Sequence, residues 1–210
     1  MLRQRQRGDT LIEVLFSVTV FSFVVVGALT IMNQGTAASQ RSLEITLVRQ
    51  QIDGQAETLR FMHNAYVAAY QPGITFNTSD TVTSPAEEWY RMLNSGITAQ
   101  SASAFGSTSS TCPTPPDESF VIDTRNVRFV NGSGTSLRPS ATFAQLSYAS
   151  DGAFQQSQGL WVEAIRSPVS SGVQSNTGFI DFHIRGCWEA PGLTAPLTTG
   201  TIVRLYEPRG

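Results

Sequence analysis

Histidine and cysteine are scarce in this chain of 210 residues, which has two of each and no lysine. Two cysteines and two histidines without ligand spacing do not make a structural zinc site, so we expect no metal. The sequence also lacks a glycine-rich phosphate loop, a calcium-binding loop and a recognised nucleophile motif around its serines and cysteines. His63 and His183 belong to no such motif. We therefore predict that the chain is not an enzyme and needs no cofactor.

The formal net charge of −2 hides an asymmetry between the N-terminus and the rest of the chain. Arg3, Arg5 and Arg7 lie in the first eight residues, which contain no acid. The remainder has 14 − 3 = 11 arginines against 16 acids, a net charge of −5. A weakly acidic body argues against a nonspecific nucleic-acid surface, and no specific nucleic-acid site is evident.

Charge is absent from residues 14–40, and this gap carries most of the functional information. Residues 11–32 read LIEVLFSVTVFSFVVVGALTIM, with Glu13 as the only charge. A helix of this length spans about 33 Å, which matches the hydrocarbon core of a bilayer. The arginines before it predict that the N-terminus stays in the cytoplasm and that the chain after Met32 lies outside.

Three interpretations compete for this apolar segment. A cleaved signal peptide is disfavoured, because the run is too long and the small residues at 36–39 continue a helical pattern. A plain signal anchor fits the hydropathy but gives Glu13 no role. A carboxylate near the centre of a membrane helix costs about 3 kcal/mol, less near its end, and such residues usually have a partner.

The third interpretation uses the residues around Gly8, which ends the arginine-rich stub and is followed by DTLIEVL. This pattern closely resembles the class III signal of type IV prepilins and type II secretion pseudopilins. The resemblance implies that a prepilin peptidase cuts between Gly8 and Asp9, and that Glu13 then pairs with the N-terminal amine of a neighbouring subunit. The family usually has an N-methylated phenylalanine where this chain has Asp9, and an acid there competes with Glu13 for the amine.

After the apolar segment the chain remains compatible with a helix to about Tyr70, and Pro72-Gly73 stops it. Apolar residues recur at spacings of three and four along one stripe of this helix, which predicts an amphipathic helix that docks a globular head. The stripe consists of Leu43, Leu47, Val48, Ile52, Ala56, Leu59, Met62 and Tyr66.

The head is predicted to contain a short helix over 87–93, opened by Ser84-Pro85, then an exposed loop over 94–111 and a set of strands. The strands are expected at 120–123, 126–130, 142–148, 159–166, 179–188 and 201–206. Within 179–188, Ile180, Phe182, Ile184 and Trp188 share one face, while Asp181, His183 and Arg185 share the other. Short connections favour an antiparallel meander, and the fold class is α+β with the long N-terminal helix packed on that sheet. The N-terminal resemblance independently implies such a fold, the pilin fold.

Cys112 and Cys187 are far apart in the sequence, and in an exported domain that pattern favours one disulfide. Two buried free thiols are the alternative. The tryptophans, which a binding surface would also use, are expected in the core; they are Trp89, Trp161 and Trp188.

We therefore predict that the chain has four segments. They are a prepilin leader over 1–8, a transmembrane and filament-core helix over 9–34, the amphipathic second half of that helix over 35–70, and an extracytoplasmic head over 71–210. Our leading hypothesis is a minor type IV pilin that serves pilus priming, adhesion, motility or DNA uptake. Its expected partners are prepilin peptidase, other pilin subunits, the inner-membrane assembly platform and the bilayer, and its expected location is the cytoplasmic membrane and then the cell-surface pilus. The alternatives are a type II secretion pseudopilin and a bitopic, signal-anchored surface protein with a binding head.

Overall fold

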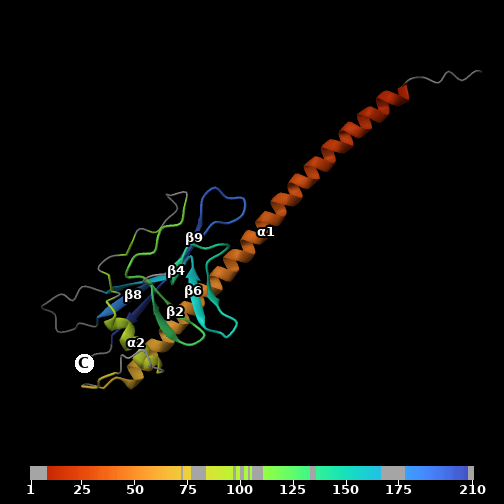
Figure 1. Cartoon of the computed structure of the whole chain (residues 1–210). Helices are drawn as coiled ribbons and strands as arrows, with labels where there is room; N and C mark the ends of the chain where they lie inside the picture. Colours follow the sequence, from red (N-terminus) through yellow and green to blue (C-terminus); the bar gives the residue numbers. More distant parts are fainter. Residues whose placement is uncertain are drawn as a thin grey trace, which may run out of the picture. The chain divides into compact units, whose positions relative to one another are not determined.

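The computed structural model describes residues 9–71, 73–76, 84–96, 98–99, 102–103, 105, 111–132, 136–166 and 178–207. The chain divides into two compact units, Met1–Leu43 and Glu44–Gly210, and each is described by itself. Helix α1 (Asp9–Ala69) runs through both units without a break, and it ends one residue before the predicted limit (Figure 1).

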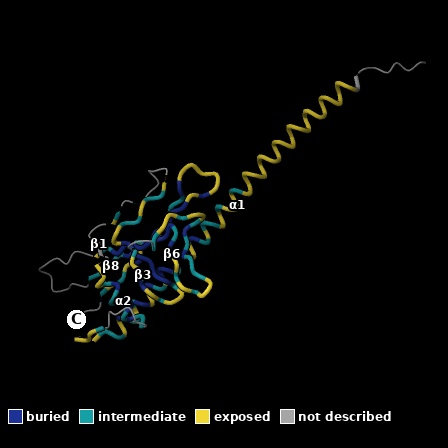
Figure 2. The backbone as a smooth tube through the Cα atoms, in the orientation of Figure 1, coloured by how far each residue is buried: buried dark blue, intermediate teal, exposed yellow. Residues whose placement is uncertain are grey.

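The described residues of the first unit form the N-terminal part of α1, and every side chain over 11–36 is exposed (Figure 2). This part of the helix is long and apolar enough to cross a membrane, as the sequence predicts. Its hydroxyl groups are satisfied within the helix: Ser17, Ser22 and Thr30 each donate a hydrogen bond to the carbonyl oxygen four residues earlier, at 2.7–2.9 Å. These polar side chains therefore bring no unpaired donor into an apolar environment.

The second unit contains residues 44–69 of α1, whose apolar stripe is buried under the sheet (Figure 2). Val48, Leu59 and Met62 are fully buried. The prediction for this stripe is wrong only at its first member, because Leu43 belongs to the first unit and is 60% exposed. Leu47 is partly buried, Ile45 packs against the core although it lies outside the predicted stripe, and Val48 is the first fully buried residue of the helix.

Two sheets form the head. The larger has the strand order β3-β2-β7-β8-β9, with β1 beside β7, and is antiparallel except at the β1–β7 pair; the smaller has the order β4-β6-β5. The larger sheet contains β1 (Thr98–Ala99), β2 (Phe120–Asp123), β3 (Arg128–Asn131), β7 (Leu160–Arg166), β8 (Phe179–Trp188) and β9 (Leu197–Tyr206). The smaller sheet contains β4 (Leu137–Arg138), β5 (Gln145–Tyr148) and β6 (Phe154–Gln158).

The α+β fold class is confirmed: the helix packs on an antiparallel sheet. Strands β2 and β8 match their predicted limits, whereas β9 begins four residues early, at Leu197. Strands β1, β4 and β6 are not predicted from the sequence. Two of them have only two residues, and β6 reads FQQSQ, so none carries a strong local strand signal.

Strand β8 confirms the predicted inner face, and its outer face also contains a buried residue. Ile180, Phe182 and Ile184 are fully buried on the inner side, and the ring of Phe182 packs 5.5 Å from that of Trp89 in helix α2 (Pro85–Asn94). On the outer side Arg185 is also buried, at 5% exposure, because residues from the segment before β2 cover it.

The buried side chain of Gln55 joins helix α1 to the sheet. Its Nε2 donates to the Ile122 carbonyl oxygen at 2.6 Å, and its Oε1 accepts from the Ile122 N–H at 2.8 Å. Strand β2 pairs with β7 only at Phe120, so Ile122 has no strand partner on that side within the described residues. Gln55 supplies the two hydrogen bonds that a neighbouring strand would otherwise make.

Replacement of Gln55 by leucine leaves the N–H and C=O of Ile122 unpaired in the core. We expect the free energy of unfolding of the head to fall by about 3 kcal/mol, measured by urea titration with near-ultraviolet circular dichroism. Gln50→Leu is the matched control, because Gln50 is an exposed glutamine on the same helix, and it should change the stability little. Equal losses from both variants would contradict the role given to Gln55.

Candidate functional site

The predicted processing site lies at the start of α1. Gly8 is outside the described residues, and Asp9 is the first residue of the helix. Cleavage between Gly8 and Asp9 therefore stays a prediction. It would place the new amino terminus four residues before Glu13.

Glu13 lies on the exposed helix of the first unit, and its carboxylate makes no hydrogen bond or ion pair within the described part of the chain. Ser17, one turn later, donates its hydroxyl to the Glu13 carbonyl oxygen at 2.7 Å and so does not reach the carboxylate. The next cation along the chain is Arg41, about 42 Å further along a regular helix. The helix thus presents one anion in a long apolar surface and offers no cation beside it.

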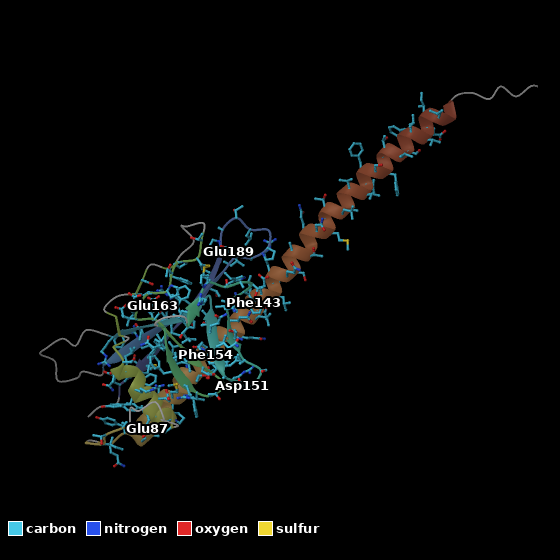
Figure 3. The ribbon with its side chains drawn as sticks, in the orientation of Figure 1. Glu87, Phe143, Asp151, Phe154, Glu163 and Glu189 are labelled. Carbon is cyan, nitrogen blue, oxygen red and sulfur yellow. A yellow bond between two sulfur atoms is a disulfide. The ribbon has the colours of Figure 1, made fainter. Side chains whose placement is uncertain are left out.

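A second cluster of functional groups lies on the outer face of the larger sheet. Glu163 of β7 and Arg185 of β8 form an ion pair with Nη1 and Oε1 2.9 Å apart, and both side chains are almost fully buried. Glu163 also accepts hydrogen bonds from Ser103 N at 2.9 Å, Ser103 Oγ at 2.8 Å and Trp161 Nε1 at 2.9 Å. Figure 3 marks Glu163 within the head.

Opposing effects set the pKa of Glu163. Burial raises the pKa, but the hydrogen bonds from Ser103 and Trp161 and the charge of Arg185 outweigh it and hold the pKa below its usual value. The carboxylate is therefore ionised at neutral pH. The Ser103 hydroxyl donates to Glu163 and accepts from Arg185 Nη1 at 2.8 Å, so it links the two members of the ion pair.

The cluster fastens the segment before β2 to the sheet. Phe105 lies with its ring 4.8 Å from the Arg185 guanidinium and edge-on to Trp161. The predicted disulfide between Cys112 and Cys187 is confirmed and attaches the same segment to β8. The expectation of an exposed loop over 94–111 is therefore wrong at Ser103 and Phe105, which are partly buried. Phe105, the only aromatic residue in that stretch, is the signal that sequence analysis missed.

The histidines lie in different surroundings. His63 Nε2 is 2.7 Å from the carbonyl oxygen of Tyr206, and its ring packs edge-on against Trp89. His183 faces outward on β8, where burial and the charge of Arg185 lower its pKa. Trp89, like the other tryptophans, is buried, as predicted. Across the described ranges, no three residues of the histidine, cysteine, aspartate and glutamate types gather as metal ligands.

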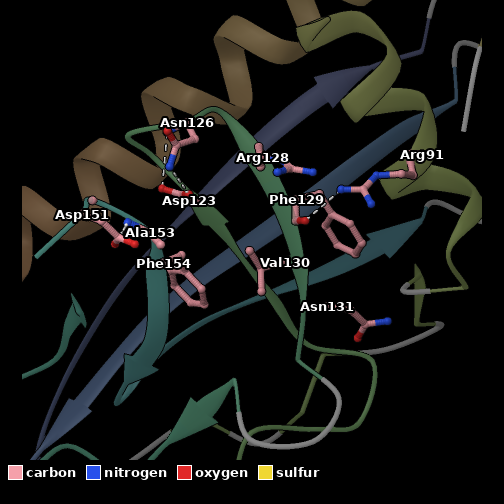
Figure 4. Close-up of a pocket in the computed structure, with 11 residues that line it drawn as sticks. Arg91, Asp123, Asn126, Arg128, Phe129, Val130, Asn131, Asp151, Ala153 and Phe154 are labelled. Carbon is pink, nitrogen blue, oxygen red and sulfur yellow. Dashed lines mark hydrogen bonds between the residues drawn. The ribbon is translucent and has the colours of Figure 1, made fainter. Parts of the chain in front are cut away.

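A polar cleft of about 720 Å³ lies between the β2–β3 hairpin and the turn before β6, with Arg91 of α2 at one side (Figure 4). The carboxylates in the cleft accept hydrogen bonds from residues of their own loops. Asp123 accepts from Arg125 N at 3.1 Å and from Asn126 Nδ2 at 2.7 Å, while Asp151 accepts from Ala153 N at 2.9 Å. These bonds shape the two turns that border the cleft.

Comparisons of the chain with models of protein families, with curated proteins and with solved structures found no match.

The ion pair of Glu163 predicts a pH dependence of stability. Because the folded pKa lies below the usual value of 4.5, the carboxylate stabilises the head fully above that value, and this contribution is lost as the pH falls through the folded pKa. Glu163→Gln leaves Arg185 buried without a counter-charge and should cost about 3 kcal/mol at pH 7. Urea titrations from pH 3 to pH 7 should show the difference from the parent shrinking on acidification.

The control for this series is Glu57→Gln. Glu57 is exposed and pairs with Arg60 at 2.6 Å on the helix surface, so its replacement should change stability little at any pH. A difference between Glu163→Gln and the parent that stayed constant down to pH 3 would contradict the assignment of the pH dependence to Glu163.

Proposed function

We propose that this chain is a membrane-anchored subunit of a type IV pilus, of the minor pilin kind. The observation that carries the proposal is the apolar helix over 11–36, whose side chains are all exposed and which is interrupted by one carboxylate without a cation in the described residues. The resemblance of the residues around Gly8 to the class III signal adds the processing step. The same features fit a type II secretion pseudopilin, which would differ in the machinery that assembles it.

The apolar helix of the first unit needs a covering partner, because exposed apolar area costs roughly 25 cal/mol per Å² in water. Phe16, Phe21 and Phe23 are each 68–80% exposed, and the leucines, valines and isoleucines near them are 38–74% exposed. A bilayer covers such a helix, and so do the helices of other subunits. Both surroundings are apolar, so transfer between them costs little hydrophobic free energy.

Glu13 favours the transfer of this helix from the bilayer to the helices of other subunits. An isolated carboxylate is unfavourable in lipid, and the amine released by cleavage after Gly8 is a cation of equal and opposite charge. Pairing between Glu13 of one subunit and the amine of its neighbour would neutralise both groups and set the axial register of the helices. Asp9 adds a second anion beside that amine, which distinguishes this chain from the usual pattern.

The head supports an extracytoplasmic location. Its disulfide between Cys112 and Cys187 is of a kind that persists in oxidising compartments. The arginines at positions 3, 5 and 7 favour a cytoplasmic N-terminus. Together these features fit a single-pass protein of the cytoplasmic membrane whose head later reaches the cell surface on a pilus.

Glu13→Ala tests the pairing. We expect the variant to stay in the membrane fraction and its amount in sheared filaments to fall at least about tenfold, as for loss of an interaction of roughly 1.4 kcal/mol or more. Immunoblots of membrane and filament fractions measure both. Glu57→Ala is the control, because it removes an exposed glutamate of the same helix outside the apolar segment. Unchanged incorporation of the Glu13→Ala variant into filaments would contradict the proposed pairing.

Mass spectrometry of the protein from cells that contain the peptidase tests the processing step. We expect a mature chain that begins at Asp9, because the residues flanking Gly8 resemble the cleavage signal. The uncleaved chain from cells without the peptidase is the reference. An intact Gly8–Asp9 bond in both strains would favour the plain signal anchor over a filament subunit.

A further inference from the structure

Strand β9 forms an edge of the larger sheet and pairs only with β8 among the described strands. The β8–β9 register runs over ten residue pairs, and the bond from Glu207 N to the Gly178 carbonyl oxygen fixes which backbone groups face β8. By the alternation of an antiparallel ladder, the even-numbered residues of β9 point their N–H and C=O groups away from β8. The contact between His63 and the Tyr206 carbonyl oxygen agrees with this assignment.

The opposite edge of the sheet is closed. At the centre of β3, the N–H of Phe129 donates to Glu88 Oε2 at 3.0 Å, and the Phe129 carbonyl oxygen accepts from Arg91 Nη2 at 3.1 Å. Both side chains come from α2. Helix α2 thus takes up both outward backbone groups of Phe129, at the centre of the edge where a further strand would bind β3.

Strand β9 has few of the features that usually protect an edge, and Arg204 is its one charged residue. The strand has no proline, and its ladder with β8 has a continuous register. Within the described residues, nothing hydrogen-bonds to the outward backbone groups of Thr198, Gly200, Ile202 and Arg204. Arg204 points its guanidinium at Asp181, with Nε and Oδ1 2.7 Å apart, and leaves its own backbone open.

A hollow of about 380 Å³ adjoins this edge at Gly200. Its lining includes Phe105, His183, Arg185 and Ile202. A Cβ at Gly200 would lie 2.7 Å from the Ile184 carbonyl oxygen and 3.6 Å from Phe105 Cε1, so a side chain there would require the backbone to shift. The hollow therefore adjoins a position that the sheet fills with glycine without a backbone shift.

The hollow suits an uncharged aromatic ring. The charge of Arg185 is balanced by Glu163, and that of Arg204 by Asp181. His183 is uncharged at neutral pH, because burial and the neighbouring Arg185 lower its pKa. Phe105 offers an aromatic wall, and an aromatic side chain on an adjacent strand is a known way to cover a glycine in a sheet.

We propose that the β9 edge binds an extended segment of a partner protein as an added strand, with an aromatic side chain opposite Gly200 in the hollow. Backbone hydrogen bonds to β9 supply affinity, and the hollow selects the side chain. This site belongs to the second unit, whereas the filament proposal rests on Glu13 in the first. Failure of one is therefore distinguishable from failure of the other.

The test uses the full-length chain in detergent micelles and two labelled nonapeptides of alternating threonine and valine with terminal lysines. One has tyrosine at its centre and the other alanine. By fluorescence anisotropy we expect the tyrosine peptide to bind about tenfold more tightly, as for roughly 1.4 kcal/mol of aromatic contact. Hydrogen–deuterium exchange should slow in residues 197–206 on binding. Equal affinity for both peptides, or protection at β3 and not at β9, would overturn the proposal.

Ile202→Pro removes one outward N–H, and proline is tolerated on an edge strand where that group faces solvent. We expect it to weaken binding of the tyrosine peptide at least about tenfold, with Ile202→Val, which keeps the N–H, close to the parent. Undiminished binding by Ile202→Pro would overturn the proposal. Self-association of the parent chain that is lost in Ile202→Pro would also overturn the proposal, because the β9 edge would then bind a second copy of this chain.

Phe105→Ala provides a second variant if Ile202→Pro melts at a lower temperature than the parent. It removes the aromatic wall of the hollow and leaves the backbone of β9 unchanged. The tyrosine peptide should then lose its advantage over the alanine peptide, while the alanine peptide binds as before. A preserved preference for tyrosine would overturn the assignment of the hollow.

Discussion

Burial of the α1 stripe against the larger sheet is the contact on which the rest of the head depends. Gly186 of β8 allows the close approach, because a Cβ there would lie 3.0 Å from Val48 Cγ1 and 3.6 Å from Ile52 Cδ1. One turn further along the helix, Gln55 replaces a missing strand beside Ile122. The same helix thus contributes its stripe to the core of the head, whereas its side chains over 11–36, in the first unit, are all exposed.

The two faces of β8 make different kinds of contact within the head. The inner face, with Ile180, Phe182 and Ile184, is apolar and packs in the core. The outer face has a buried ion pair that fastens the segment around Ser103. A buried ion pair adds little net stability but holds its partners in one geometry, since a displaced partner leaves an uncompensated charge. The disulfide at Cys187 restrains the same segment covalently.

The proposed roles use different parts of the chain for different kinds of contact. The exposed helix offers apolar area and one carboxylate, which suit lipid and other helices. The head offers a strand edge and a glycine hollow, which suit an extended segment of protein. Helix α2 closes the edge at β3 with Glu88 and Arg91 and leaves β9 open, so the head directs strand addition to one side of the sheet.

Local patterns in the sequence were sufficient for the long helix, the limits of β2 and β8, the buried tryptophans and the Cys112–Cys187 pair, because hydrophobic periodicity and cysteine count are properties of short segments or of composition. The processing motif around Gly8 is likewise a sequence feature. Only the tertiary structure decided that Gln55 bonds Ile122, that Ser103 lies on Glu163 and Arg185, and that Gly200 borders a hollow. Those contacts join residues 60 or more positions apart, or depend on which strand ends at the sheet edge. No local periodicity encodes such pairings, since they arise only when the packed elements bring distant polar groups out of water together.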